Sequence, residues 1–263
     1  MRLIIGLLIA FSILFLGTAA IVYLHDHLSD VSIWNSPIWK AWKTPLIVCA
    51  VILGVAILLY VNYLSQQKAE QAERELALAQ GWGYTVRSDD REGLLPKISA
   101  VLETAAPEKK FDVISTVMTV PFEKRDFFLF GCSYSARSSR QNSKPGSACL
   151  IQSDRLRDMR THVEIFPRNA LDSALTFNKV DMGDTEFARA YIVSSQDPAE
   201  AHRIINESMQ LMLVDYKNSP GFTGNFEIAL GPGGAVILNW GQASPEDWLA
   251  LAGMGRRFAS AMR

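Results

Sequence analysis

Residues 111–120 read FDVISTVMTV, and this stretch decides the fold of the C-terminal part of the chain. It is rich in β-branched residues and partly alternates between polar and apolar side chains, which predicts a β-strand that Pro121 ends. Residues 127–137 predict a second strand, and residues 147–152 predict its hairpin partner. The connecting residues 138–146 (SSRQNSKPG) are turn-forming throughout. The centre of this region is therefore expected to be an antiparallel hairpin.

The segments that follow predict more strands and two helices. Four further strands, of which the last two form a hairpin, are expected at 161–166, 187–195, 226–230 and 235–240. One helix is predicted to begin after the cap residue Asp197 and to run to Tyr216, and another is predicted to begin after Ser244. Strands with helices packed on one side predict a soluble α+β domain with antiparallel strands over residues 81–263.

Two long apolar runs precede this domain. Residues 3–24 and residues 45–64 carry no charged side chain. A bilayer core needs roughly 20 apolar residues, so both runs predict transmembrane α-helices. A cleavable signal peptide is the alternative for the first run. Residues 65–80 are rich in Ala, Glu and Gln, and they predict a helical stalk that continues the second helix.

The predicted order of domains is thus a two-helix transmembrane hairpin over 1–64, the stalk, and the α+β domain. The loop 25–44 between the two helices holds Trp34, Trp39 and Trp42. Tryptophan prefers the headgroup layer of a bilayer, where its ring is sheltered and its N–H group is hydrated. We therefore expect these three residues to lie at the membrane interface.

The distribution of basic residues near the two apolar runs predicts an orientation. Arg2, Lys68 and Arg74 flank the ends that carry the two termini, whereas Lys40 and Lys43 lie in the connecting loop. Cytoplasmic segments carry the excess of Lys and Arg. The chain is therefore predicted to be a multi-pass protein of the bacterial inner membrane, with its soluble domain in the cytoplasm and the lipid bilayer as a partner.

The overall charge gives no support to nucleic-acid binding. The chain has 26 Lys+Arg and 27 Asp+Glu, which leaves a net charge of -1. Arg137, Arg140 and Lys144 nevertheless cluster around the tip of the predicted 138–146 turn. Anionic headgroups attract clustered basic side chains, so we expect these three residues to contact the lipid surface.

No motif for catalysis, for a cofactor or for a metal ion emerges. Residues 231–234 (GPGG) lack the lysine of a phosphate-binding loop and lead into a strand, so a hairpin turn is the better interpretation. Cys132 and Cys149 lie on the two arms of the predicted hairpin, and we expect them to be free thiols that pack as small hydrophobes. His162 and His202 are not marked by their local sequence as catalytic bases. We therefore predict no catalytic residue, no cofactor and no metal ligand.

The soluble part resembles a loose group of bacterial membrane-anchored proteins of unknown function, which have one or two N-terminal transmembrane helices and a C-terminal α+β domain. Four short segments carry the resemblance: 81–84 (GWGY), 130–134 (FGCSY), 166–168 (FPR) and 183–187 (GDTEF). The resemblance implies the α+β fold and membrane anchoring. It implies no activity and no catalytic residues.

Three functions stay open. The first is a membrane-tethered, non-enzymatic domain that binds a membrane or cytoplasmic protein partner or the lipid surface. It fits the stalk, the tryptophan-rich loop and the lack of a nucleophile–base motif. The second is a membrane-anchored hydrolase whose site is not visible in the sequence. The third is an accessory subunit of a membrane protein complex, whose helices pack through small residues.

Overall fold

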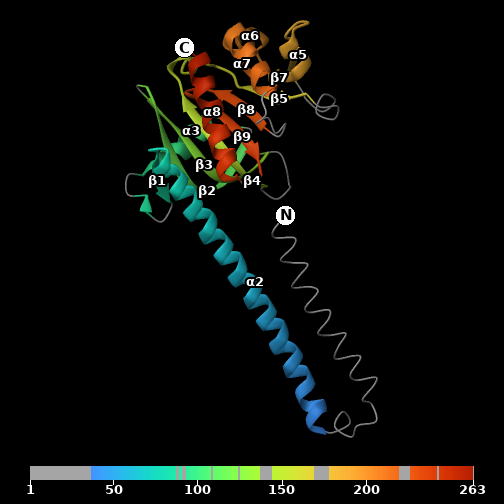
Figure 1. The fold of residues 1–263 in the computed structure, drawn as a ribbon. Helices are drawn as coiled ribbons and strands as arrows, with labels where there is room; N and C mark the ends of the chain where they lie inside the picture. The colour runs from blue at the N-terminus through green and yellow to red at the C-terminus, as the bar shows by residue number, and fades with distance from the viewer. Residues whose placement is uncertain are drawn as a thin grey trace. The chain divides into compact units, whose positions relative to one another are not determined.

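The computed structural model describes residues 37–86, 89–90, 93–107, 109–123, 125–136, 144–168, 178–218, 226–241 and 243–262. The described helices are α2 (Pro37–Ala79), α3 (Leu94–Ala105), the short 3-10 helix η2 (Asp154–Leu156), α5 (Glu186–Ala190), α6 (Pro198–Ile204), α7 (Glu207–Lys217) and α8 (Pro245–Ala261). The described strands are β1 (Gly83–Val86), β2 (Lys109–Phe122), β3 (Arg125–Ala136), β4 (Lys144–Gln152), β5 (Val163–Pro167), β6 (Lys179–Val180), β7 (Tyr191–Ser195), β8 (Phe226–Gly231) and β9 (Gly234–Trp240) (Figure 1).

The strands form one nine-stranded sheet in the order β1-β2-β3-β4-β9-β8-β5-β7-β6. All the neighbouring pairs are antiparallel. The predicted hairpins are confirmed, because β3 pairs with β4 and β8 pairs with β9. The chain contacts divide the molecule into two units, Met1–Glu73 and Arg74–Arg263, and the sheet belongs to the second unit.

The prediction that Pro121 ends the first strand is wrong. Strand β2 continues to Phe122, and Pro121 pairs with Asp126 of β3. On its other side β2 pairs with β1 only between Thr116 and Thr119. Proline lacks a backbone N–H group, and it is tolerated here because that side of β2 has no neighbouring strand at this level.

The predicted single helix after Asp197 is divided into α6 and α7. The Asp197 side chain caps α6 by accepting a hydrogen bond from the Glu200 N–H group at 3.1 Å. Asn206 then caps α7 in the same way, by accepting from the Met209 N–H group at 2.9 Å. A side chain that satisfies the N–H groups at a helix start favours a new helix at that residue. The second predicted helix is confirmed, because Ser244 and Asp247 form a reciprocal capping box at the start of α8.

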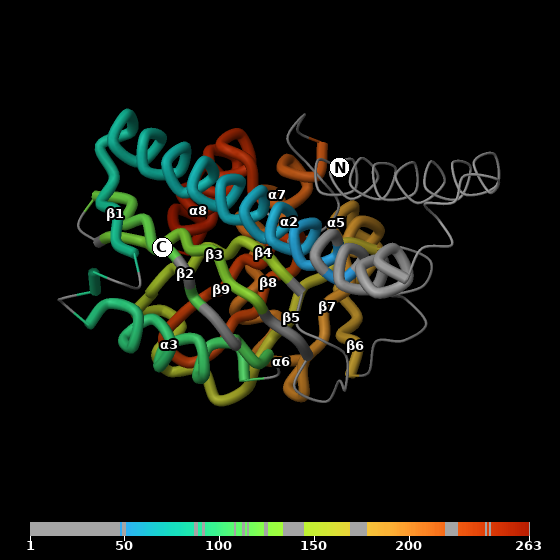
Figure 2. The backbone as a smooth tube through the Cα atoms, turned by 90° about the horizontal axis from the view of Figure 1, so that it is seen from below, coloured from blue at the N-terminus to red at the C-terminus, as the bar shows by residue number. Residues whose placement is uncertain are grey.

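Both faces of the sheet are covered, but by different numbers of helices. Figure 2 shows α3 on one side of the strands and α8 on the other. On the face that we call the α8 face, helices α5 to α8 contribute large buried side chains such as Phe187, Trp248 and Phe258. On the opposite face, the α3 face, helix α3 contributes Ile98 and Leu102 to a smaller core. Helix α3 packs against β2, β8 and β9. Strands β5, β6 and β7 therefore lie outside the part of this face that α3 covers.

The predicted membrane-spanning helix at 45–64 is wrong. These residues belong to α2, a single helix of 43 residues. Over the part of the chain that the structure describes, no helix is both long enough and apolar enough to cross a bilayer.

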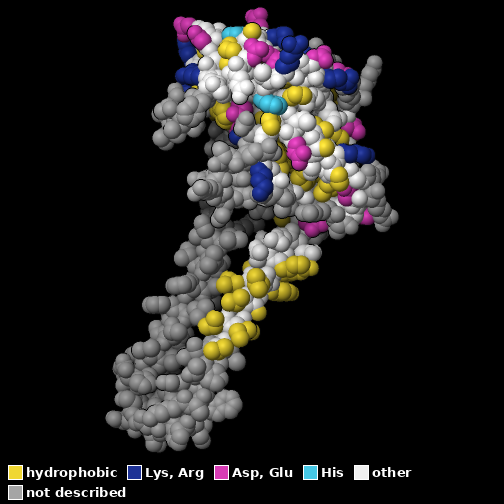
Figure 3. All heavy atoms as spheres, turned by 180° about the vertical axis from the view of Figure 1, so that it is seen from behind, with side chains coloured by type: hydrophobic (Ala, Val, Ile, Leu, Met, Phe, Trp, Pro, Cys, Tyr) yellow, Lys and Arg dark blue, Asp and Glu magenta, His cyan; other side chains and the backbone are white. Residues whose placement is uncertain are grey.

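Several linked predictions are corrected by the same finding. For the described residues, the predicted fold class with two transmembrane α-helices is wrong. The predicted assignment as a multi-pass protein of the bacterial inner membrane is wrong for the same reason. The other predicted span, 3–24, lies outside the described residues. Most of the described large apolar side chains of α2 between Val48 and Leu64 are 40 to 66 % exposed (Figure 3).

The predicted interfacial loop 25–44 is also corrected in part. From Pro37 onward these residues are helical and belong to α2. Trp39 and Trp42 therefore lie on a helix, although their side chains are outside the description, and Trp34 lies outside the described residues altogether. The tryptophan-rich segment is helical here because α2 begins at a proline, which is favoured in the first turn of a helix.

Candidate functional site

A cavity lies where β5, β6 and β7 meet the loop that leads into α5. It has a volume of about 580 Å³. Val180, Ala188 and Ile192 contribute apolar side chains to its lining, and Arg168 and Lys179 contribute charged ones. We call this cavity the basic groove. An apolar lining with a few converging polar groups is the usual composition of a ligand site.

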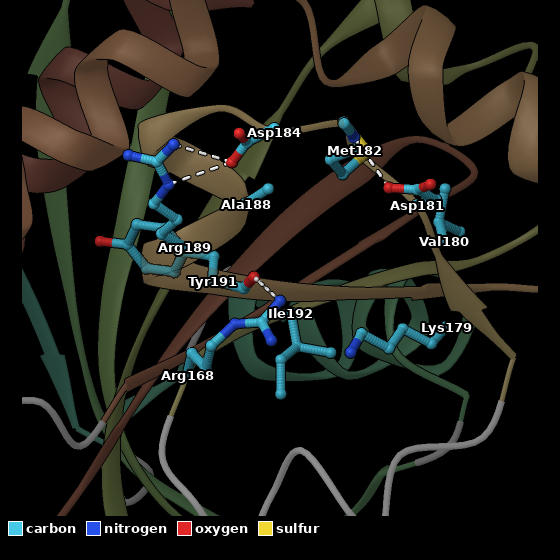
Figure 4. Close-up of a pocket in the computed structure, with 11 residues that line it drawn as sticks. Arg168, Lys179, Val180, Asp181, Met182, Asp184, Ala188, Arg189, Tyr191 and Ile192 are labelled. Carbon is cyan, nitrogen blue, oxygen red and sulfur yellow. Dashed lines mark hydrogen bonds and ion pairs between the residues drawn. The ribbon is translucent and has the colours of Figure 1, made fainter.

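Two positive charges converge in the basic groove. In Figure 4 the Arg168 guanidinium and the Lys179 ammonium group point towards each other from either side of Ile192. The Arg168 Nη2 atom also donates a long hydrogen bond of 3.5 Å to the Tyr191 carbonyl oxygen. Both side chains are exposed, and Ile192 is 1 % exposed. Like charges that face each other across an apolar surface favour an anion between them.

The two carboxylates of the groove lining have other partners. Asp184 Oδ1 accepts hydrogen bonds from Arg189, from Nε at 3.1 Å and from Nη2 at 2.8 Å. Asp181 Oδ1 accepts the Gly183 N–H group at 2.9 Å. The lining therefore holds three positive and two negative side chains, of which Arg168 and Lys179 are the two cations without a carboxylate partner among the described residues.

Local sequence holds this loop in place. Gly183 has a φ of 74°, which glycine adopts without strain, and the Asp181 side chain closes the turn around it. Thr185 caps α5 by accepting the Ala188 N–H group at 3.0 Å. Tyr191 anchors the following strand, because its ring stacks on Phe187 at 5.3 Å. The Tyr191 hydroxyl also donates to the Leu213 carbonyl oxygen at 2.7 Å.

A second charged group lies on the α3 face, and we call it the buried cluster. It consists of Lys109 of β2, Glu164 of β5 and Glu227 of β8. The Lys109 Nζ atom lies 3.5 Å from Glu164 Oε1, and it forms a closer ion pair with Glu227 Oε1. It also lies 5.8 Å from the centroid of the Phe166 ring. The side chains are 12 % exposed in Lys109, 21 % in Glu164 and 2 % in Glu227.

Burial determines the protonation of this cluster. It raises the pKa of Glu227 to about 7, against the opposing attraction of Lys109. Burial alone would lower the pKa of Lys109, but the charges of Glu227 and Glu164 outweigh it, and that pKa is raised. Lys109 is therefore a permanent cation at neutral pH, whereas Glu227 is a carboxyl group that can hold a proton.

The buried cluster lies on the same face of the sheet as the two cations that converge in the basic groove. Glu164 pairs with Ser194 of β7, and Ser194 pairs with Lys179 of β6. Residues that pair directly across strands point to the same face. Along β5, alternation places Glu164, Phe166 and Arg168 on one face, and the Arg168 N–H group continues the ladder by donating to the Ala190 carbonyl oxygen at 2.7 Å. The two charged groups are thus neighbours on one surface.

Another buried carboxylate, that of Glu200 on α6, has a structural role. Its oxygens accept the N–H groups of Arg160 and Thr161, the Thr161 hydroxyl at 2.6 Å and the Arg203 guanidinium at 3.2 Å. Burial works to raise the pKa of Glu200, but these hydrogen bonds prevail and lower it to about 2. Glu200 therefore ties α6 to the segment after η2 as a permanent anion.

A second cavity, of about 480 Å³, lies beside the β2–β3 turn. Phe122 and Phe127 line it with rings at 6.2 Å, together with Glu123, Asp126 and Asp154. Glu123 adopts a φ of 54°, a conformation that is strained for a side chain other than glycine. Asp154 is already engaged by Arg157 at 2.7 Å.

The basic residues predicted to touch a lipid surface are not those that form the groove. Arg137 and Arg140 lie outside the described residues, and Lys144 is the first residue of β4, with an undescribed side chain.

Cys132 and Cys149 are buried free thiols, as predicted. They are not opposite one another, because Cys132 pairs with Gly146 and Cys149 pairs with Leu129. Their side chains lie in different cores on the two faces of the sheet. Burial raises the pKa of Cys132 to about 12 and that of Cys149 further still, so neither supplies a thiolate at neutral pH. Among the described side chains, no three His, Cys, Asp or Glu residues are grouped closely enough to hold a metal ion.

The sequence reasoning missed the two residues that converge in the groove. Arg168 appears in it only within the 166–168 segment, and Lys179 does not appear at all. They are separated along the chain and become neighbours only through the pairing of β5 with β7 and of β7 with β6. No local pattern could have revealed this.

Comparisons with known proteins add little to the geometry. No family model matches the chain, and neither does a curated protein. One solved structure is similar, the crystal structure of the mycobacterial trehalose monomycolate transport factor A, TtfA. The likeness covers 74 % of this chain and 94 % of that chain, at 12 % sequence identity and a TM-score of 0.46. At these values the likeness carries no argument about function.

Proposed function

We propose that this protein is a non-enzymatic binding domain that holds an acidic segment of a partner protein in the basic groove. The observation that carries the proposal is the convergence of Arg168 and Lys179 across Ile192 in a cavity of about 580 Å³. The lining carboxylates are already engaged by Arg189 and by a backbone N–H group. A carboxylate of a partner therefore meets two cations without displacing an existing ion pair.

The geometry fits an extended acidic peptide better than a small enclosed ligand. The groove opens at the edge of the sheet, where Lys179 belongs to the outermost strand β6. Its charged groups are exposed, whereas Ile192 between them is buried. Exposed cations around an apolar floor provide electrostatic attraction and specificity, and the floor adds apolar contact. The resemblance to bacterial membrane-anchored proteins stays a prediction and is not needed for this proposal.

No feature of the described residues favours the hydrolase alternative. The thiols of Cys132 and Cys149 are buried and protonated. The carboxyl group of Glu227 is ion-paired inside the sheet, and that of Glu200 is fully engaged in hydrogen bonds. These groups stabilise the fold or hold charge, and they do not reach a substrate in the groove.

The test uses the full chain and two fluorescently labelled peptides, hexaglutamate and hexalysine, with binding measured by fluorescence anisotropy at low salt. The wild-type chain is expected to bind hexaglutamate and not hexalysine, and added salt should weaken the binding because exposed charges are screened. The double variant Arg168→Glu/Lys179→Glu should lower the affinity about tenfold or more.

The matched control is Arg256→Glu/Arg257→Glu, which makes the same charge change at two exposed residues of α8. It should leave the affinity within about twofold of the wild type, because α8 covers the other face of the sheet. Equal losses in the two double variants, or no binding of hexaglutamate by the wild type at low salt, would overturn the proposed function.

A further inference from the structure

The buried cluster holds an excess of negative charge that its surroundings do not neutralise. Two carboxylates, of Glu164 and Glu227, share the single ammonium group of Lys109. No other ion pair of these three residues occurs among the described side chains. Burial of an unbalanced charge is costly, and a carboxyl group in this position lowers the cost by taking up a proton.

We infer that the buried cluster is a proton-binding site, and that a proton bound there strengthens the hold of the basic groove on an acidic ligand. This inference rests on the function proposed above, since it concerns the same groove. The link between the two is geometric. Glu164 and Lys179 are separated by one strand, with Ser194 between them on the same face of the sheet.

The expected size of the effect follows from this spacing. Glu227 lies on β8 and Lys179 on β6, so three strand spacings place their Cα atoms about 14 Å apart. Removing one negative charge at about 14 Å changes the affinity for a singly charged group about 1.6-fold in a water-like medium, and about sevenfold at an effective dielectric constant of about 20. The burial of Glu227, whose side chain is 2 % exposed, places the effect above the lower limit.

The pH range follows from the groups on this face. The pKa of Glu227 is raised to about 7 by burial. The other charged or titratable groups of the surrounding elements are Lys109 on β2, Glu164 and His162 at β5, and Lys97 and Glu103 on α3. Lys109 keeps its charge, because its own pKa is raised. His162 is the histidine beside this cluster, so its replacement serves as a control.

The first measurement tests the proton site without any ligand. The free energy of unfolding is determined by urea denaturation of the full chain between pH 6 and pH 8. The folded state of the wild type should bind more protons than the unfolded state, so its stability should fall as pH rises across this range. In Glu227→Gln this fall should disappear, whereas in Glu103→Gln, an exposed carboxylate on α3, and in His162→Gln it should persist. A wild-type stability that does not change, or a fall that disappears only in His162→Gln, would overturn the proton site.

The second measurement tests the link to the groove. Hexaglutamate that carries a pH-insensitive dye on its N-terminus keeps a constant charge from pH 6 to pH 8, and its affinity for the wild type should be between about 1.6-fold and about sevenfold higher at pH 6. Glu227→Gln should bind it equally at both values, as tightly as the wild type binds it at pH 6. Binding that is independent of pH in the wild type would overturn the link alone. Failure to bind at either pH would overturn the link together with the proposed function, while the stability measurement decides the proton site separately.

Discussion

The two faces of the sheet each hold a buried carboxyl group, and the pKa values of these two groups are shifted in opposite directions. On the α8 face, the buried carboxylate of Glu200 accepts several hydrogen bonds, and the pKa of Glu200 is lowered to about 2. On the α3 face, the carboxylate of Glu227 has to share Lys109 with Glu164, and its pKa is raised. Burial acts to raise the pKa of both carboxyl groups, and only at Glu200 do enough hydrogen-bond donors converge to outweigh it.

The buried charge on the α8 face stabilises the fold, whereas the buried charge on the α3 face lies beside the proposed binding groove. Helices α5 to α8 cover their face with large buried side chains, and Glu200 fixes α6 to the segment after η2. Helix α3 covers only part of the other face, and the charged groups of β5, β6 and β8 lie beside it. A surface that keeps an unbalanced charge next to two exposed cations is suited to binding.

The largest effect is expected from removing the shared cation of the buried cluster. Lys109→Met leaves two carboxylates without a partner, and it should lower the free energy of unfolding at pH 8 by about 3–5 kcal/mol. At pH 5 the loss should be smaller, because both carboxyl groups can take up protons and the folded state then binds more protons than the unfolded state. Urea denaturation at the two pH values measures both quantities. Lys110→Met, at the neighbouring exposed lysine, should change stability by about 0.5 kcal/mol or less. Equal effects of the two variants would contradict the role of the cluster.

Two glycines, one on each face, sharpen the comparison. A Cβ atom at Gly231 would lie 2.7 Å from the carbonyl oxygens of Thr104 and Ala105, which belong to the backbone of α3 and cannot move aside. Gly231→Ala should therefore destabilise the chain by about 3 kcal/mol. A Cβ atom at Gly255 would meet Cys149 Sγ at 2.8 Å and the Phe127 ring at 3.0 Å.

The side chains of Cys149 and Phe127, which a Cβ atom at Gly255 would meet, can shift slightly. Gly255→Ala should therefore lower the free energy of unfolding by less, about 1–2 kcal/mol. Thermal and urea denaturation of the two variants would compare them directly. A larger loss in Gly255→Ala would show that α8 is the more rigidly held helix, against the packing described here.

An effect of similar size is expected at Glu200. Glu200→Gln keeps the shape of the side chain but weakens the charge-assisted hydrogen bonds from Thr161 and Arg203, and it should cost about 1–3 kcal/mol at pH 7. The lowered pKa of Glu200 contributes stability above the ordinary value of 4.5, and this contribution is lost as the pH falls towards about 2. The difference between wild type and variant should therefore shrink across that acid range. A difference that stays constant from pH 7 to pH 3 would argue against this account of Glu200.

The parts of the fold that local patterns control could be predicted from the sequence. The residues 138–146 predicted the β3–β4 turn, and the side chains of Asp197 and Ser244 predicted two helix starts. The second cap, at Asn206, was missed because the apolar spacing continues across it. The apolar run 45–64 predicted a membrane span from its composition alone. In the structure it is part of α2, a longer helix that continues into the polar residues after it.

The candidate site could not be predicted, for a physical reason. Arg168 and Lys179 meet through strand pairing, and Lys109 reaches Glu227 although β2 and β8 are not neighbours in the sheet. Such contacts depend on the order of the strands, which residue spacing along the chain does not specify. The basic residues that the sequence did bring forward, Arg137, Arg140 and Lys144, are grouped along the chain, and local grouping of charge is not a guide to a site built by a sheet.

The most direct test of the central claim is hydrogen–deuterium exchange of the full chain with and without hexaglutamate. The claim is that an acidic ligand binds on the α3 face, at the basic groove. We expect the peptide to slow exchange in β5, β6 and β7, around Arg168 and Lys179, and to leave α8 unchanged. Protection confined to α7 and α8, with no change in the groove strands, would contradict the account.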